Sequence, residues 1–378
     1  MIGYKKLMAV LLLVFINALS IVDLLTPDRK FSATENRMLE PNPEFSLRHL
    51  TSGKFTANYE KYVSDQFPFR DFWIGVKSDT DRAMGQKESN GVYLGKGGYL
   101  IQQFQPPAQE EVEEIAEAIR SFDAAAPALQ TYVMLAPTSL TMNKDRLPAF
   151  APAGEELVYL DKLRNALGRS ARFVDVYPAL YAKRQEYLYY KADHHWTTLG
   201  AYYAYREFCR QMGVVPHEAD DFDIRQATDE FYGSLYSRSG FRHLRPDRID
   251  LWLPKEKDSY SVEYVDEQQT ADSLYALENL SKKDKYAVFL NGNHALVKII
   301  SDHPAGKKLL VVKDSYANSL IPFLTAHFGE IYVVDLRYYS EDLLALIRDQ
   351  EIHDMLVLYN VNTFFSDPSI KNLSEMIE

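Results

Sequence analysis

The stretch KKLLVVKDSYANS, residues 307–319, decides the fold. Its first half has an apolar centre, Leu309 to Val312, and the length of one β-strand, and Asp314 and Ser315 follow where that strand must turn. We predict a buried strand over 307–315 and a helix over 316–328. A serine between a strand and a helix stands at the carboxyl end of the strand, which is where open α/β sheets bind their ligands.

Short apolar strands alternate with helical segments on both sides of this stretch. The further predicted strands are 131–137, 330–339 and 354–360, with another that begins at 171. The further predicted helices are 110–126, 155–168, 198–212 and 340–350. Such an alternation predicts an α/β fold with a parallel sheet covered by helices on both faces.

Residues 213–305 interrupt the alternation. Three segments there have the apolar and aromatic composition of strands, namely 259–267, 285–293 and 294–302. We predict either a β-rich insertion in the main domain or additional strands at an edge of its sheet.

The region before the main domain has a different composition. Residues 27–88 are predicted as a polar, proline-containing linker followed by N-terminal helices that break at Pro68. Residues 92–101 are predicted as a β-hairpin around a glycine-rich turn. We therefore expect one large domain over 89–378.

The first 25 residues, MIGYKKLMAVLLLVFINALSIVDLL, have the composition of an export signal. Lys5 and Lys6 precede an apolar run from Leu7 to Val22. The run is slightly short for a membrane span and slightly long for the core of a signal peptide, and no clear cleavage site follows it. We predict that residues 1–26 form a signal anchor or a signal peptide, with an anchor favoured. The lysines then stay in the cytoplasm, and the rest of the chain lies on the extracellular face of the membrane or is secreted.

The bulk composition narrows the choice of partners. The 378 residues carry a formal net charge of −11 at pH 7, which repels phosphates and argues against nucleic acid. Tyrosine occurs 26 times, and rings with one polar edge are common both in sugar-binding grooves and in protein cores. The one cysteine, Cys209, lies in a predicted helix and is expected to be a buried thiol.

The motif Asp-His-His-Trp, residues 193–196, stands immediately before a predicted helix. A histidine takes the proton of a serine best when a carboxylate orients its ring, so Asp193, a histidine and Ser315 together suit acyl transfer. Consecutive side chains of an extended turn point to opposite sides, which predicts that only one histidine faces the serine. The rival interpretations are a helix cap and a metal site built from Asp193, His194 and His195.

Several segments together resemble the DHHW protein family, namely DHHWTTLGAYYAY, KDSYANS, VYLGKGGYL, FSATENRMLEPNPEF and DQFPFRD. The first three are also similar to the SGNH-hydrolase-like domain of the alginate O-acetylation proteins, which carry an Asp-x-His-Trp motif upstream of a serine turn and a GKDGWL-type segment. The resemblance covers most of the chain after the N-terminal segment. It implies an SGNH-hydrolase-like, flavodoxin-like sheet that is circularly permuted. The strand at 307 is then the first of the usual order, and the strands at 131 and 171 are the fourth and fifth.

The resemblance also implies roles for individual residues. Ser315 is implied as the nucleophile, His195 as the base and Asp193 as the orienting carboxylate. The Ser315 N–H and the Asn360 side chain are implied as oxyanion donors. The family's Gly-x-Asn-Asp block reads Tyr-Asn-Val-Asn here, so Asn362 is the alternative to Asn360.

Four further side chains are predicted to touch the substrate: His194, Trp196, Tyr316 and Arg242. For Trp196 the alternative is packing. For Arg242, which belongs to a basic loop in an acidic protein, the alternative is a solvated loop.

The implied function is an outward-facing, serine-dependent O-acyl (acetyl) transferase or esterase acting on cell-surface polysaccharide, without a metal or another cofactor. A membrane-bound acyltransferase is the implied acyl donor. The alternative is a non-catalytic glycan-binding or envelope polysaccharide assembly protein that retains the fold.

Overall fold

The computed structural model describes residues 2–32, 34–256, 259–302 and 306–375. The chain forms two compact units, Met1–Ser89 with Ser237–His243, and Asn90–Tyr236 with Leu244–Glu378. Parts of the predicted N-terminal segment, insertion and main domain lie outside the described residues, at 1, 257–258, 303–305 and 376–378.

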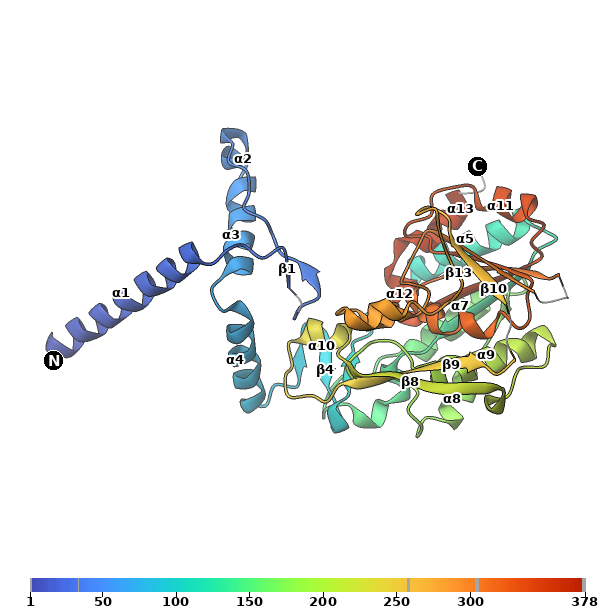
Figure 1. The fold of residues 1–378 in the computed structure, drawn as a ribbon, viewed down its shortest axis with the longest axis horizontal. Coiled ribbons are helices and arrows are strands. Elements are labelled where there is room, and N and C mark those ends of the chain that lie inside the picture. Colours follow the sequence, from blue (N-terminus) through green and yellow to red (C-terminus); the bar gives the residue numbers. More distant parts are fainter. Residues whose placement is uncertain (1, 33, 257–258, 303–305, 376–378) are drawn as a thin grey trace. The chain divides into compact units, whose positions relative to one another are not determined.

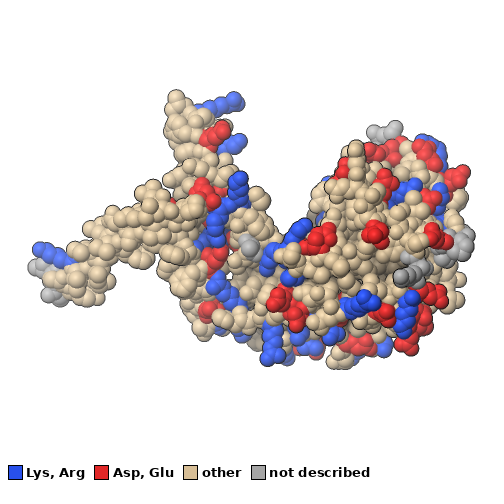
Figure 2. All heavy atoms as spheres, viewed as in Figure 1, with Lys and Arg blue, Asp and Glu red and all other residues tan. Residues whose placement is uncertain are grey.

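The first unit begins with helix α1 (Ile2–Leu25), the blue helix at the N-terminus in Figure 1. Between Gly3 and Leu25 it is long and apolar enough to cross a membrane, and its apolar window is not buried against the protein, so it fits a signal or an anchor. Figure 2 shows it as a largely uncharged rod with basic side chains at its N-terminal end.

Three more helices follow in this unit. They are α2 (Leu47–Thr51), α3 (Lys54–Gln66) and α4 (Arg70–Ala83), and a short ribbon of β1 (Phe31–Ser32) and β2 (Arg37–Met38) precedes them. The predicted break at Pro68 is confirmed. Phe67 has extended ψ of 132°, because the ring of a proline disfavours the helical conformation of the residue before it.

The second unit is built on an eight-stranded sheet in the order β11-β10-β12-β14-β13-β15-β6-β7. Five strands are parallel: β6 (Gln130–Ala136), β7 (Arg172–Phe173), β13 (Lys308–Lys313), β14 (Glu330–Val334) and β15 (Asp354–Asn360). The remaining three form an antiparallel edge: β10 (Tyr260–Tyr264), β11 (Gln269–Ala271) and β12 (Leu296–Ser301). Residues 213–305 thus add strands to the main sheet.

The order of the parallel strands confirms the predicted fold class. Counted from β13 along the chain and then from β6, the strands stand in the order 2-1-3-4-5 of a flavodoxin-like sheet. The fourth and fifth strands come first in the chain, which is the expected circular permutation.

Helices cover both faces of the sheet (Figure 1). On one face lie α8 (Tyr177–Ala182) and α9 (Thr198–Met212). On the other lie α5 (Gln109–Ala125), α7 (Glu156–Leu167), α11 (Leu343–Asp349), α12 (Val361–Ser366) and α13 (Asn372–Glu375). Because successive strand residues point to opposite faces, Leu309 and Val311 enter the first core while Leu310 and Val312 enter the second.

Two antiparallel ribbons complete the unit. The predicted hairpin is confirmed as β4 (Val92–Leu94) and β5 (Leu100–Gln102). The second ribbon consists of β8 (Phe222–Phe231) and β9 (Asp247–Pro254). The short helix α10 (Ser234–Ser239) begins just after β8.

Two predicted elements are wrong. Residues 316–328 do not form an α-helix but the short 3₁₀ helices η6 (Ser315–Ser319) and η7 (Ile321–Phe323), since Pro322 removes a backbone donor from the middle of the segment. Residues 285–293 are not a strand. They form η5 (Lys285–Val288) and a turn with positive φ at Leu290, Asn291 and Gly292, a conformation that strands do not adopt.

Gly200 allows α9 to pack closely against the backbone at Leu188, which precedes the helix in the chain. A Cβ at this position would lie 2.5 Å from the Leu188 carbonyl oxygen and 3.0 Å from the Trp196 Cβ. Gly200→Ala should therefore lower the free energy of unfolding by about 1–3 kcal/mol, because a backbone carbonyl cannot move aside cheaply. Urea unfolding followed by near-UV circular dichroism measures the change. Gly3→Ala, in a helix with open space around it, is the matched control, and equal midpoints for the two variants would contradict the close packing.

Candidate active site

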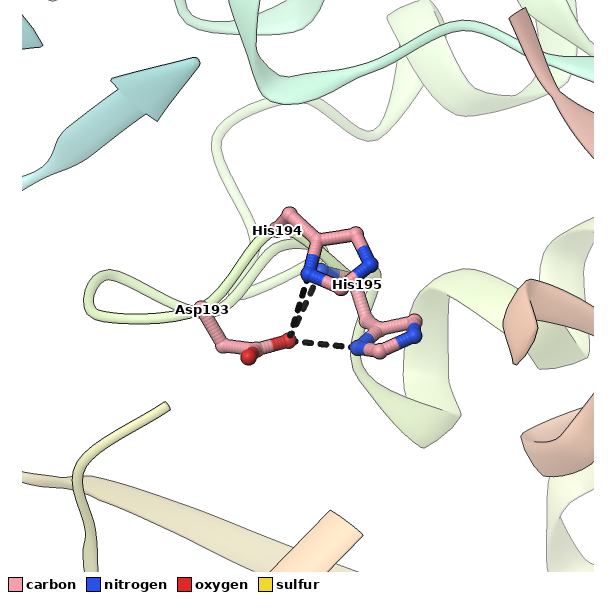
Figure 3. A group of neighbouring side chains, drawn as sticks. All are labelled: Asp193, His194 and His195. Atoms are coloured by element: carbon pink, nitrogen blue, oxygen red, sulfur yellow. Dashed lines mark hydrogen bonds and ion pairs between the residues drawn. The ribbon is translucent and has the colours of Figure 1, made fainter. Parts of the chain in front are cut away.

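Three side chains form a hydrogen-bonded line at the carboxyl edge of the sheet. Asp193 and His195 lie in the turn before α9, and Ser315 is the first residue of η6, directly after β13. His195 Nδ1 lies 2.5 Å from Asp193 Oδ1 (Figure 3), and His195 Nε2 lies 2.7 Å from Ser315 Oγ. When Nδ1–H donates to the carboxylate, Nε2 is left to accept the serine proton.

Asp193 is a buried carboxylate with several donors around it. Its Oδ1 also accepts the backbone N–H of His195 at 2.9 Å, and its Oδ2 accepts that of Ser234 at 2.7 Å. Burial alone would raise the pKa of this carboxyl, but the rings of His195 and His194 and the hydrogen bonds outweigh burial and hold the pKa well below its usual value. Asp193 is therefore ionised at neutral pH.

The approach of the ribbon to Asp193 requires a glycine. A Cβ on Gly233 would lie 2.2 Å from the Asp193 Cβ and 2.3 Å from its Oδ2. Gly233 immediately precedes the Ser234 N–H that binds the carboxylate, so any larger residue there would push the two groups apart.

A second buried carboxylate, Asp247 at the start of β9, holds the turn that carries the motif. It accepts the backbone N–H groups of Lys191 at 2.9 Å and Ala192 at 2.7 Å, and the hydroxyl of Tyr187 also donates to it. Burial raises the pKa of Asp247. No motif in the sequence pointed to Asp247 or Ser234, which come from the segment between α9 and the central strands.

The two histidine rings lie side by side, which corrects the expectation that they point apart. Their centroids are 3.8 Å apart, and His194 Nδ1 lies 3.8 Å from Asp193 Oδ1 (Figure 3). The expectation assumed an extended turn, whereas residues 191–195 bend around the carboxylate. His194 Nδ1 pairs with Ser234 Oγ at 2.6 Å, whereas His195 Nε2 contacts Ser315 Oγ.

Tyr286 packs on the ring of His195, and it was not identified as a site residue from the sequence. Its ring is parallel to that of His195, with 3.7 Å between centroids and 9° between planes. Its hydroxyl lies 3.1 Å from the Ser315 carbonyl oxygen and 3.2 Å from Ser319 Oγ. The segment around Tyr286 has strand-like composition, and no local pattern could show that it reaches His195.

Trp196 and Tyr316, predicted to touch substrate, are packing residues instead. Both have no exposed surface. The indole N–H of Trp196 donates to the Tyr316 carbonyl at 2.9 Å, and the Tyr316 hydroxyl donates to the His194 carbonyl. Together they hold the motif against η6. Arg242 belongs to the first unit, where its guanidinium lies directly on Gly75 of α4.

Asn360 does not offer a side-chain donor to an oxyanion. Its amide nitrogen lies 2.6 Å from both Asp314 Oδ2 and Thr363 Oγ1, which uses both hydrogens, and its oxygen caps α12 by accepting the Thr363 N–H. The expected role is corrected to a helix cap that also binds the carboxylate next to Ser315. The alternative, Asn362, donates to the Gln103 carbonyl at 3.3 Å.

The ligand atoms of Asp193, His194 and His195 lie within 4.8 Å of one another, as a metal site would require. However, His195 Nδ1 and Asp193 Oδ1 are only 2.5 Å apart. Two ligands of one tetrahedral zinc ion, each at about 2.0–2.2 Å from the metal, lie more than about 3 Å from each other. A shared proton, rather than a metal, fits this distance.

We therefore expect no zinc at this cluster. Equilibrium dialysis with zinc should give the same metal content for the wild-type protein and for His194→Ala, because the hydrogen bond between His195 and Asp193 keeps both groups from the ligand geometry. One zinc per chain in the wild type that His194→Ala loses would replace the relay with a metal site.

Comparisons with known proteins find one matching family and several similar solved structures. The model of the family described as DHHW protein matches residues 124–334. Among solved structures, a DHHW family protein from Eubacterium siraeum aligns with a TM-score of 0.66 and 24% identity, over 75% of this chain and 96% of that one. Bacillus cereus PatB1 with a sulfonyl adduct aligns with a TM-score of 0.61 and 18% identity, over 72% and 97%. The O-acetyltransferase domain of Pseudomonas putida AlgJ gives a TM-score of 0.46 and 14% identity, over 75% and 99%.

A search of curated proteins gives no match. The resemblance inferred from the motifs is confirmed by the family model, whose matched region spans more than half of the sequence and contains both the Asp-His-His-Trp motif and Ser315. The chain belongs to the DHHW protein family.

Proposed function

We propose that this protein is an outward-facing, serine-dependent O-acyltransferase or esterase that transfers or removes acetyl groups on a cell-surface polysaccharide. The observation that carries the proposal is the line from Ser315 Oγ through His195 to Asp193, with distances of 2.7 Å and 2.5 Å. Such a line activates a serine that would otherwise be a weak nucleophile.

The chemistry follows from this geometry. Ser315 Oγ attacks the carbonyl carbon of an acyl ester while His195 Nε2 takes its proton, and the ionised Asp193 stabilises the imidazolium that forms. The imidazolium then gives the proton to the departing alcohol, which leaves an acyl-serine. A sugar hydroxyl or water next loses a proton to His195 and attacks the acyl carbon. The bond between that carbon and Ser315 Oγ then breaks, and the imidazolium returns its proton to Oγ. Attack by a sugar hydroxyl gives transfer, and attack by water gives hydrolysis.

The N–H of Ser315 is the proposed oxyanion donor. Ser315 opens η6, and the first backbone N–H groups of a helix have no partner within that helix. This N–H belongs to the same residue as the attacking oxygen. It is therefore close enough to donate a hydrogen bond to the carbonyl oxygen as negative charge develops there.

The exposure of the three residues suits a surface substrate. Asp193 and His195 are buried, at 2% and 5% exposed, whereas Ser315 is partly exposed. A substrate can therefore reach the nucleophile while water is kept from the charged pair, which strengthens the interaction between them.

A cavity of about 710 Å³ is the proposed groove for the glycan. Its lining includes Tyr177, Tyr181 and Arg184, with Glu156 at the start of α7. Aromatic faces combined with polar groups suit a sugar ring. The buried Glu156 carboxylate also accepts the Thr138 N–H just after β6, which links this cavity to the carboxyl edge of the sheet.

The proposed acyl donor is a membrane-bound acyltransferase that passes acyl groups outward to Ser315. The apolar helix α1 supports this location, since as a retained anchor it would keep the protein at the membrane. The second candidate, a non-catalytic glycan-binding or assembly protein with the same fold, predicts an unreactive Ser315.

Covalent labelling separates the two candidates. A fluorophosphonate probe should modify Ser315 of the full chain, because His195 and Asp193 make its oxygen nucleophilic. Mass spectrometry of the digested protein identifies the labelled residue. Ser315→Ala should remove the label, and His195→Ala should slow labelling by several orders of magnitude.

His194→Ala is the matched control for the histidine. It removes a neighbouring imidazole ring that contacts Ser234 rather than Ser315 Oγ, so most of the labelling should remain. A wild-type Ser315 that stays unlabelled would favour the non-catalytic candidate. If instead His194→Ala is the inert variant, the assignment of the base is wrong.

Tyr286 is proposed as a positioning residue for His195. Tyr286→Leu should lower kcat for an activated acetyl ester about tenfold and leave KM nearly unchanged, since the aromatic face orients the ring and stabilises the imidazolium, an effect of about 1–2 kcal/mol. Tyr286→Phe keeps the stacked ring and should recover most of the rate. Equal losses in both variants would mean that the hydroxyl, and not the stacked ring, matters.

A further inference from the structure

Helices α3 and α4 of the first unit expose an unusual number of large apolar side chains around one groove. The groove has a volume of about 560 Å³, and its apolar and aromatic lining consists of Tyr59, Val63, Phe67, Trp73 and Ile74. Four of these are 38–46% exposed, although aromatic residues normally bury most of their surface. A contiguous exposed apolar surface of this kind marks a contact with a partner or a membrane.

The charged groups at the groove do not oppose an apolar partner. Arg70 lines the groove, but its guanidinium pairs with Glu35 and its Nε–H donates to the Ser64 carbonyl. Only Glu60 among the lining residues is acidic. The aromatic residues, which have an apolar body and one polar edge, are those enriched where hydrocarbon meets water in membranes.

Hydrogen bonds fix this groove close to the end of α1. The Tyr62 hydroxyl donates to Asp28 at 3.0 Å, the Arg29 N–H donates to the Gln66 side chain at 3.0 Å, and Arg29 donates to Asp71 at 3.0 Å. Asp28 is three residues beyond Leu25, the last residue of α1, and three residues span at most about 11 Å.

The same hydrogen bonds limit how far the groove-lining residues can lie from the end of α1. Each groove-lining residue is close in the chain to one of these hydrogen-bonded residues. Val63 follows Tyr62 directly, Tyr59 is about one helical turn before Tyr62, and Trp73 is two residues after Asp71. With 24 residues, α1 is about 36 Å long, so its ends reach the interfacial layers of a membrane with a core of about 30 Å. The groove is then held at the level of the outer headgroups.

We propose that the groove-lining face of α3 and α4 rests in the outer interfacial layer of the membrane that holds α1. The proposal takes α1 as a retained anchor. The proposed occupant is lipid. The short segment between Leu25 and Asp28 keeps the groove next to the bilayer whether or not a partner protein is bound. The aromatic side chains would sit among the headgroups and the apolar ones at the ends of the acyl chains.

Trp73 provides a direct test. The protein has three tryptophans; Trp196 and Trp252 are buried at 0% and 4% exposure, and α1 contains none. The full chain is placed in phosphatidylcholine nanodiscs whose lipids carry bromine either near the headgroup end or near the middle of the acyl chains. Bromine near the headgroups should quench tryptophan emission, by at most the share of one residue in three, and bromine at the middle should quench less.

Variants separate lipid contact from other causes of quenching. Trp73→Phe should abolish the quenching, and adding Tyr59→Trp to that variant should restore it. Adding Met84→Trp instead is the matched control, because Met84 is an exposed residue at the far end of α4, about 15 Å along the helix axis from Ile74, the nearest groove-lining residue. It should show weaker quenching.

Three results would overturn the proposal. The first is emission that is the same in brominated and unbrominated lipid, which would assign the groove to a protein partner or to a second copy of the chain. The second is equal quenching at positions 59 and 84. The third is a full chain that does not remain in the nanodiscs.

Discussion

The hydrogen bond from His195 to the buried carboxylate of Asp193 is the interaction on which the site depends. An ionised carboxylate in a protein interior is costly unless its neighbours compensate the charge. Here the compensation comes from His195, from the backbone N–H of Ser234 and from the ring of His194. These groups belong to segments on both sides of α9, so the ribbon of β8 and β9 is part of the site although it lies outside the central sheet.

The same constraint explains why the motif is held so firmly. A carboxylate that must orient a ring has to be oriented itself, and Asp247 does so indirectly by fixing the two backbone N–H groups just before Asp193. Behind the two histidines, Trp196 and Tyr316 pack against each other and hold the turn against η6. Each layer of contacts leaves His195 fewer alternative positions.

Much of the fold could be predicted because its signals are local. The strand at 354–360 and the helix at 198–212 lie where the apolar pattern placed them, since a buried parallel strand and an amphipathic helix differ in length and periodicity. The strand order came from the resemblance to a known family, because periodicity does not say which strands are neighbours. Ser315 and His195 were paired in the same way, across 120 residues of chain.

The errors have a common physical origin in long-range contacts. Trp196 and Tyr316 have polar edges that suit either a ligand or a buried partner, and only the fold shows that each finds a backbone carbonyl. Asn360 stands where an oxyanion donor would stand, but the pattern Asn-x-x-Thr also caps a helix, and the cap uses the amide. Tyr286 reaches His195 from a segment whose composition suggested only a strand.

The permuted order of the strands has a consequence for how the protein is made. β15 lies between β13 and β6, so the strands that are synthesised first remain separated from the centre of the sheet until almost all of the chain is present. Non-local parallel pairing of this kind forms slowly and leaves apolar strand edges exposed in the meantime. Asp193 and His195 also leave the ribosome well before Ser315, which follows His195 by 120 residues. The hydrogen-bonded line from Ser315 through His195 to Asp193 therefore forms only when the sheet is nearly complete.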